Sequence, residues 1–408
     1  MEAAPGESRN PFESPGFRRW WAASLVAGTG VGIQVVTVPL FIRDRVAGDD
    51  RALAISAALI AQTLPGALLA LFGGAIADRV EQRRILVRSY GVAAAVSTLY
   101  VALCVADAAA IWPVFPLAAL VGSAGAFTNP ARQSMLPQLV SRTALQNGVI
   151  FGTMGFMASL QFLGPFLGGL LADGFGLAVA FAAETALLVA GAAMFAGVAT
   201  RPPAPSGRNV LGDLAEGVRY VARAPALRGI LLLAIVPGVF FIGPFAVTVP
   251  IVVPDFFAAS DRWVGLLWGC FGAGVFAGSI LLTRLPISRR GLALCVSTLA
   301  GGIVLILYGQ SRALPLSASL LFVWGLGAAV FINYAVVLLQ HHSEPRMIGR
   351  VMSMYTLVFL GASPLGYLQA GMVTDRFGPG AALVSSGWIA AAIGLAAILL
   401  LRPVRALD

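Results

Sequence analysis

The sequence predicts an all-α integral membrane protein with twelve transmembrane helices arranged as two pseudo-symmetric six-helix bundles. Hydrophobic residues make up 58% of the 408 residues and charged residues only 11%, with a mean hydropathy of +0.87. A soluble protein carries about 25% charged residues, so this chain cannot cover a water-facing surface. A series of long apolar runs and an internal repeat complete the prediction.

A helix needs about 20 mainly apolar residues to cross a bilayer. Twelve runs in the chain meet this requirement, six in each half. Gly and Pro are frequent inside them, as is usual for membrane helices. The expected spans are roughly 17–41, 52–76, 84–106, 111–131, 145–171, 177–199, 228–253, 262–283, 290–309, 314–340, 349–373 and 379–401.

The orientation of these spans follows from the basic residues, all 27 of which are arginine. With the N-terminus inside the cell, 21 arginines fall on the inner side and 6 on the outer side. The positive-inside rule therefore predicts that both termini are cytoplasmic. Nucleic-acid binding would need a concentrated basic patch, whereas these arginines are spread between spans, so no nucleic-acid partner is expected.

The polar segments divide the chain into parts. The N-terminal segment lacks the apolar core of a signal peptide. The longest polar break begins Pro-rich and then carries an amphipathic pattern, which predicts a helix lying on the inner membrane surface; an interfacial strap is favoured over a regulatory docking element. The expected parts are a disordered cytoplasmic tail (1–16), an N-terminal bundle (17–199), a linker (200–227), a C-terminal bundle (228–401) and a cytoplasmic tail (402–408).

Three short segments recur between the two halves. The pairs are GGAIADR at 73–79 with GSILLTR at 278–284, FTNP at 127–130 with FINY at 331–334, and ADGFG at 172–176 with TDRFG at 374–378. Their offsets of 205, 204 and 202 residues are nearly constant. This register indicates duplication of a six-helix unit, and parallel repeats of this kind occur in transporters.

The chain is similar to the major facilitator superfamily, and within it to the enterobactin-exporter and macrolide-efflux-like branch. The similarity covers almost everything from Phe17 to Leu400 and rests most on GGAIADRVEQRR (73–84), NPARQSMLPQLV (129–140), GPFLGGLLADGFG (164–176), DLAEGVRYVARAPALR (213–228) and GRVMSMYTLVFLGASPLGYLQAG (349–371). The resemblance implies two bundles that rock about a central cavity to give alternating access.

The charged loop after the second span is the first candidate functional element. Asp78 lies where it could face the N-terminus of a neighbouring helix, whose dipole favours a carboxylate. The resemblance implies contact with the eleventh span, so we expect a latch between Asp78 and Arg350 that closes the cytoplasmic side. Arg79, Arg83 and Arg84 would brace this latch or bind lipid phosphate; the alternative is that they only enforce topology.

Two features bear on the direction and energy source of transport. Gly164, Pro165, Gly168 and Gly169 resemble the core of the family's antiporter motif and favour efflux over uptake. Of the 18 acidic residues in the sequence, Glu184 alone lies well inside an expected span, where a charge costs about 2.5–3.5 kcal/mol. It is therefore the proton-coupling candidate, although a neutral Glu hydrogen-bonded within the N-terminal bundle is an equally fair interpretation.

Related proteins often carry an acidic residue near the start of the first span. Here that region reads GTGVGIQ, with Gln34 and no carboxylate, and this weakens the transfer of a coupling site from the family. Arg132, at the inner end of the fourth span, could gate the cavity or meet an anionic substrate. Trp20 and Trp21 are interpreted as interfacial anchors.

Substrate contacts are expected from polar and aromatic residues at mid-depth. A cavity lined by amides and aromatic rings suits a bulky amphipathic molecule, although any of the polar side chains could instead join two helices. The polar candidates are Gln34, Gln62, Gln161, Asn333, Tyr334 and Tyr355, and the apolar wall consists of Phe241, Phe245, Trp268 and Trp324.

Other chemistries find little support in the sequence. His341 and His342 are adjacent, so their side chains point in different directions on a helix, and no metal site is expected. Without lysine the chain has no Walker-type nucleotide loop. We expect no enzymatic activity and no cofactor, with a proton gradient as the driving force.

The sequence therefore predicts a transporter that exports a hydrophobic or amphipathic small molecule, such as a siderophore or macrolide-like drug, in exchange for protons. We expect a monomer in contact with membrane lipids, in the bacterial cytoplasmic (inner) membrane. An importer on the same fold and a non-transporting membrane receptor are the alternatives.

Overall fold

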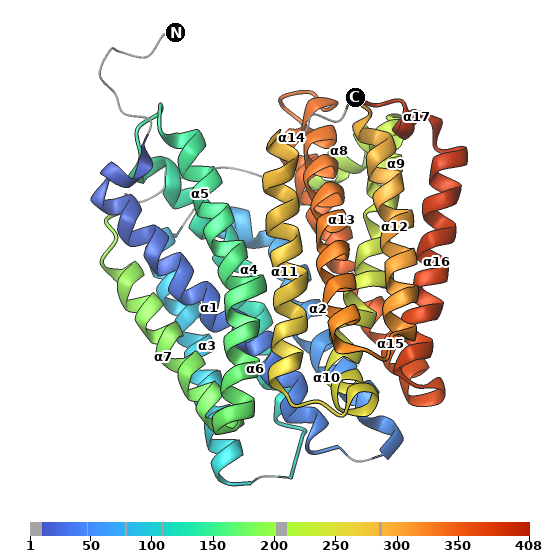
Figure 1. Cartoon of the computed structure of the whole chain (residues 1–408). Helices are drawn as coiled ribbons and strands as arrows, with labels where there is room; N and C mark the ends of the chain where they lie inside the picture. The colour runs from blue at the N-terminus through green and yellow to red at the C-terminus, as the bar shows by residue number, and fades with distance from the viewer. Residues whose placement is uncertain (1–9, 47, 78–79, 108, 201–209, 285–287) are drawn as a thin grey trace.

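The computed structural model describes residues 10–46, 48–77, 80–107, 109–200, 210–284 and 288–408. Across these ranges the regular structure is entirely helical. Twelve helical segments in the described part are long and apolar enough to cross a membrane, which confirms the predicted fold class. They lie side by side in Figure 1, with the beginning of the first long helix (Pro15–Arg43) and the C-terminus at the same end of the molecule. We call this end the N/C face and the other end the opposite face.

The first half contains two 3-10 turns, η1 (Pro11–Glu13) and η2 (Gly48–Asp50), and the helices α1 (Pro15–Arg43), α2 (Arg51–Ala77), α3 (Gln82–Val105), α4 (Val114–Leu139), α5 (Leu145–Ala158), η3 (Ser159–Leu163), α6 (Gly164–Phe175) and α7 (Leu177–Ala196). The linker region contains α8 (Val210–Arg223), where the amphipathic helix was expected. The exact boundaries between bundles and linker stay a prediction.

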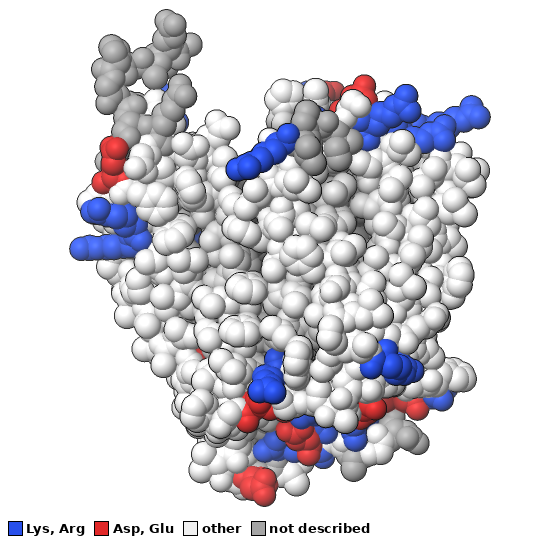
Figure 2. All heavy atoms as spheres, in the orientation of Figure 1, with Lys and Arg blue, Asp and Glu red and all other residues white. Residues whose placement is uncertain are grey.

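The second half contains α9 (Pro225–Leu233), η4 (Pro237–Ile242), α10 (Gly243–Phe257), α11 (Arg262–Arg284), α12 (Arg290–Gln310), α13 (Leu314–His341), α14 (Ile348–Gly361), α15 (Ser363–Phe377), α16 (Pro379–Leu400) and α17 (Arg402–Arg405). Figure 2 shows the charged side chains gathered at the two ends, with a largely uncharged band between them on the visible side. Such a band is what the hydrocarbon core of a bilayer requires.

Three of the predicted spans are interrupted rather than regular: 145–171, 228–253 and 349–373. The first two contain the π-helical turns η3 and η4, and the third breaks at Ala362 between α14 and α15. A proline follows each interruption closely, namely Pro165, Pro244 and Pro364. Proline lacks a backbone N–H and its ring crowds the preceding turn, so one hydrogen bond of the helix is missing there and the backbone can depart from the regular α-helix.

The two halves meet through glycine-lined contacts in which α6 packs against α11 and α2 packs against α15. A β-carbon at Gly169 would lie 2.7 Å from the backbone nitrogen of Gly265, and one at Gly371 would collide with the Ser56 side chain. Only glycine permits such close approach of two helices.

The internal repeat is visible in the backbone. α6 and α15 end at Gly176 and Gly378, whose φ angles are +85° and +84° and whose ψ angles are 164° and 162°. Their N–H groups donate hydrogen bonds to the carbonyl oxygens of Ala172 and Thr374 at 3.0 and 2.8 Å. Two helices far apart in sequence thus end in the same way, which supports duplication.

Replacing Gly378 by alanine should destabilise the protein by about 1–3 kcal/mol, because this backbone region is open essentially to glycine alone. Thermal unfolding of purified protein in detergent measures the effect. Gly91→Ala is the matched control, since this helical glycine in α3 has open space around it. Equal unfolding midpoints for Gly378→Ala and the unmodified protein would contradict the assignment.

Candidate functional site

Glu184, Gln34 and Gln62, from three different helices, form one line of hydrogen bonds, which we call the amide chain. Glu184 on α7 is fully buried, and its Oε1 accepts a hydrogen bond of 3.0 Å from Nε2 of Gln34 on α1. Oε1 of Gln34 in turn accepts one of 3.2 Å from Nε2 of Gln62 on α2. Oε2 of Glu184 has no hydrogen-bond partner among the described residues.

The amide chain brings together residues that the sequence assigned to different roles. Glu184 was expected to be a proton site, and the two glutamines were expected to contact substrate. The carboxyl group reaches α1 from α7, at the position where an amide replaces the acid expected from related proteins. A carboxyl group in so dry a place, with only the neutral side chains of Gln34 and Ser97 beside it, is held better as the neutral acid than as an anion.

The four predicted aromatic wall residues form one cluster in the second half. The ring of Phe245 lies 4.5 Å from that of Trp268 and 5.3 Å from that of Trp324, and Phe241 lies 5.6 Å from Trp324. Phe241, Phe245 and Trp324 are buried in this conformation, whereas Trp268 is half-buried. The cluster therefore acts as core packing, and Trp268 is its most exposed member.

The other polar candidates lie in separate places. Gln161, in the π-helical turn η3, donates to Sδ of Met157 at 3.5 Å. Asn333 joins α13 to α11 through Ser279 at 3.2 Å. Tyr334 and Tyr355 are buried, and the hydroxyl of Tyr355 has no hydrogen-bond partner within the described ranges.

Arg132 is buried at 2% exposure between α1, α4 and α5. Its guanidinium donates to Oδ1 of Asn129 at 3.0 Å and lies 3.9 Å from the ring centre of Phe156. Trp20 was wrongly interpreted as an interfacial anchor: it is 1% exposed, and its Nε1 donates to the carbonyl oxygen of Arg132 at 3.2 Å. The indole is needed inside the bundle, where its N–H satisfies a buried carbonyl.

The charged loop after α2 is only partly described, and Asp78 and Arg79 lie outside the described residues. Arg83 and Arg84 each form an ion pair of 2.8 Å with Glu81, directly before α3. Desolvation raises the pKa of Glu81, but the hydrogen bond from Thr200 and the charges of Arg83 and Arg84 outweigh it and lower the pKa below its ordinary value. The two arginines thus brace their own loop.

Arg350, the expected partner of Asp78, forms an ion pair of 2.8 Å with Glu216 on the linker helix α8. Gly217 lets α8 approach closely, because a β-carbon there would lie 3.2 Å from Sδ of Met354. Tyr220 on the same helix accepts a hydrogen bond from the backbone of Glu344 at 3.0 Å. The linker helix is therefore docked on α14, and the Asp78–Arg350 latch stays a prediction.

Polar contacts that were not predicted from the sequence join the two halves at the opposite face. Arg43, at the end of α1, forms a two-pronged ion pair with Asp261, with oxygen–nitrogen distances of 2.6 and 2.9 Å. Asp375 on α15 accepts hydrogen bonds from the backbone N–H groups of Ala52 and Leu53 at 2.9 and 2.8 Å. The first N–H groups of a helix lack partners within it, so Asp375 caps α2 from the other half.

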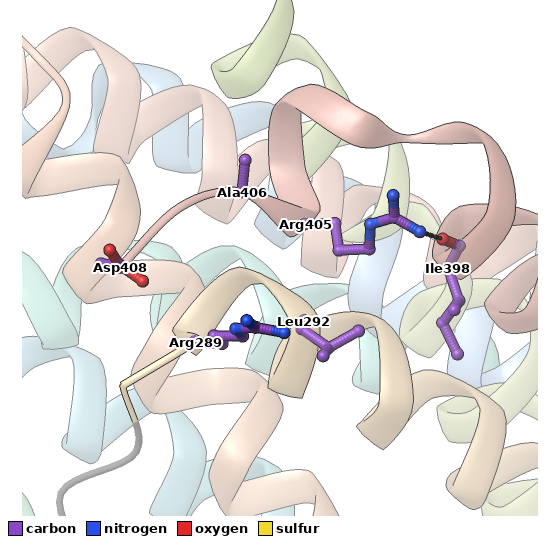
Figure 3. A pocket seen from close by; sticks show the side chains of 6 residues that line it. All are labelled: Arg289, Leu292, Ile398, Arg405, Ala406 and Asp408. Atoms are coloured by element: carbon purple, nitrogen blue, oxygen red, sulfur yellow. Dashed lines mark hydrogen bonds between the residues drawn. The ribbon is translucent and has the colours of Figure 1, made fainter.

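A hollow of about 520 Å³ opens on the N/C face of the second half (Figure 3). Arg405 points across it and donates to the carbonyl oxygen of Ile398 at 2.7 Å. The lining residues are Arg289, Leu292, Ile398, Arg405, Ala406 and Asp408. None of the predicted substrate residues is among them, so this hollow is separate from the amide chain and from the aromatic cluster.

Removing the Asp375 carboxylate should open the opposite face. Loss of such a cap costs about 1 kcal/mol, which corresponds to about a fivefold shift between closed and open populations. The reporter is Ser56→Cys, a buried position facing Gly371, placed in a background that lacks the three native cysteines. Asp375→Ala should raise labelling of this cysteine by a membrane-impermeant maleimide about fivefold.

Asp173→Asn is the control for this experiment. Asp173 is the repeat-related residue at the end of α6, and it is exposed. Labelling of the reporter should be unchanged in this variant. Equal labelling in Asp375→Ala and in the parent would show that the cap does not hold the face closed.

Comparisons with known proteins agree with this architecture. A family model described as "Transmembrane secretion effector" matches residues 7–408. The chain is 25% identical to the multidrug efflux pump Tap of Mycobacterium tuberculosis (strain ATCC 25618 / H37Rv), covering 96% of this chain and 94% of that protein. It is 24% identical to the enterobactin exporter EntS of Escherichia coli O1:K1 / APEC, covering 96% and 93%.

Among solved structures, the crystal structure of the human organic anion transporter MFSD10 (TETRAN) resembles the chain with a TM-score of 0.66 and 16% sequence identity, covering 95% of this chain and all of that one. This likeness concerns the fold. The family match spans nearly the whole sequence, and the relatives are transporters rather than enzymes. The chain therefore belongs to the transmembrane secretion effector family of the major facilitator superfamily.

Proposed function

We propose that this protein exports a hydrophobic or amphipathic small molecule, a siderophore or a macrolide-like drug, from the cytoplasm in exchange for protons. The names of its relatives support export, since one is a multidrug efflux pump and one an enterobactin exporter. The membrane is the bacterial cytoplasmic (inner) membrane. The N/C face is its cytoplasmic side, in line with the positive-inside rule.

The observation that carries the antiport proposal is the burial of Glu184. An ionised carboxylate at membrane depth costs about 2.5–3.5 kcal/mol, so the closed core favours the neutral acid. The same group can ionise when a rearrangement brings water or further donors to it. A proton is thereby bound in one conformation and released in another, which links the proton gradient to the conformational equilibrium.

The contacts at the opposite face support alternating access. Arg43 with Asp261, and Asp375 with the start of α2, hold the two halves together there. Release of substrate on that side requires these contacts to break. The energy for breaking them comes from substrate binding coupled to loss of the proton, whereas proton binding favours the return to the closed state, because each ligand can shift the equilibrium only by its differential affinity for the two states.

Glu184→Gln should abolish proton exchange while leaving the fold intact, since glutamine keeps the shape of the side chain but cannot ionise. Purified protein in proteoliposomes is mixed with enterobactin or with a macrolide, and proton release is followed with a pH-sensitive dye. We expect release by the unmodified protein and at least a tenfold smaller signal in Glu184→Gln.

Asp173→Asn serves as the control for removing an exposed carboxylate and should release protons normally. Persistent release in Glu184→Gln would assign the proton to another residue. Inverted membrane vesicles test the direction: an interior made acidic should drive accumulation of the probe. Accumulation in right-side-out vesicles instead would favour an importer.

A further inference from the structure

The amide chain has a direction and an exposure gradient. Gln62 donates to Gln34, and Gln34 donates to Glu184, so both hydrogen bonds point toward the carboxyl group. The exposed fraction is 0% at Glu184 and 5% at Gln34, and Gln62 is half-buried. The chain therefore leads from a fully buried carboxyl group to a partly exposed amide side chain.

Gln62 lies at the junction between the halves. Its helix α2 packs against α1 and α4 of its own half and against α10, α14 and α15 of the other half. The Gln62 side chain donates to Gln34 on α1, so it points into its own bundle from a helix that packs against both halves. The side-chain carbonyl oxygen of Gln62, Oε1, accepts no hydrogen bond from the described residues.

We propose that Gln34 is a positioning residue that couples a hydrogen-bond donor on the substrate, bound at the Gln62 carbonyl, to release of the proton from Glu184. The proposal rests on the proposed antiport function. It adds the requirement that the substrate carries a hydroxyl, catechol or amide N–H group near the atoms that meet Gln62.

The physical reason is polarisation along the chain. Hydrogen bonds in series strengthen one another in a medium of low dielectric constant. A donor arriving at Gln62 makes its N–H a better donor to Gln34, which then donates more strongly to Glu184. A stronger donor at Oε1 stabilises the carboxylate relative to the neutral acid.

Oε1 is occupied by Gln34, and Oε2 has no hydrogen-bond partner among the described residues, so the proton of the neutral acid resides on Oε2. On release, the O–H bond at Oε2 breaks and its electron pair stays on the carboxylate. The proton passes to water. Substrate binding and proton release are then one linked event.

Gln34→Leu tests the proposal because leucine fills the space without donating or accepting a hydrogen bond. Proton release on addition of enterobactin or a hydroxyl-bearing macrolide should fall at least tenfold, while binding of the probe, followed by tryptophan fluorescence, persists. Gln34→Asn, one methylene shorter, should behave in the same way and guards against misfolding of the leucine variant.

A spectroscopic measurement separates positioning from a general structural effect. The carboxyl C=O stretch of Glu184, identified by its loss in Glu184→Gln, is recorded by infrared difference spectroscopy. It should move to higher frequency in Gln34→Leu, because Oε1 loses its hydrogen bond. An unmoved band would overturn the proposal.

Gln369→Leu is the matched control. Gln369 on α15 is also half-buried and also joins two helices, through a hydrogen bond of 3.2 Å to Ser386 on α16, but it is not part of the amide chain. Its loss should leave both the proton release and the infrared band unchanged.

Gln62→Leu should abolish probe-induced release.

The substrate requirement is tested with a hydroxyl-bearing macrolide and its O-methylated analogue. The methylated probe should bind but release at least tenfold less proton. Equal release by both probes, or by Gln34→Leu and the unmodified protein, would overturn the coupling role and leave the antiport proposal standing. Failure of the unmodified protein to release protons with any probe would instead overturn the antiport proposal itself.

Discussion

The buried hydrogen bond between Glu184 and Gln34 is the interaction on which the arrangement of the first half depends. It joins α7 to α1 at a depth where a charge without a partner is expensive. Gln62 extends the connection to α2, the helix that packs against both halves. A titratable group is thereby connected, through two amides, to a helix that contacts both halves.

The two faces of the protein are held by different kinds of contact. Ion pairing and helix capping join the halves at the opposite face, through Arg43, Asp261 and Asp375. At the N/C face the linker helix α8 is docked on α14 through Glu216 and Arg350. Arg350 thus contacts α8, which belongs to the linker between the halves, and this contact gives the linker a structural role beyond tethering.

Much of the fold could be predicted because hydropathy and arginine placement are properties of the sequence alone. The interruptions in three spans could not, since Pro165, Pro244 and Pro364 are also tolerated in continuous membrane helices. The repeat was detectable because Gly176 and Gly378 occupy a backbone conformation that few other residues accept.

The site was only partly predictable. Glu184 stood out as an acidic residue within a span, and Gln34 and Gln62 stood out as polar residues at mid-depth. Their connection depends on how each helix is rotated about its axis, which the sequence does not specify. The capping role of Asp375 was hidden for the same reason, although the TDRFG segment that contains it was recognised as part of the repeat.

The duplicated ends of α6 and α15 share a glycine turn but differ in how the neighbouring half is held. The contact between α2 and α15 is held by the hydrogen bonds that the first N–H groups of α2 donate to Asp375. The contact beside α11 is held by the ion pair of Arg43 and Asp261. Salt screens a partly buried ion pair much less than an exposed one. The side chains of Arg43 and Asp261 are only 11% and 22% exposed, so this pair beside α11 keeps most of its strength when the outer medium is salty.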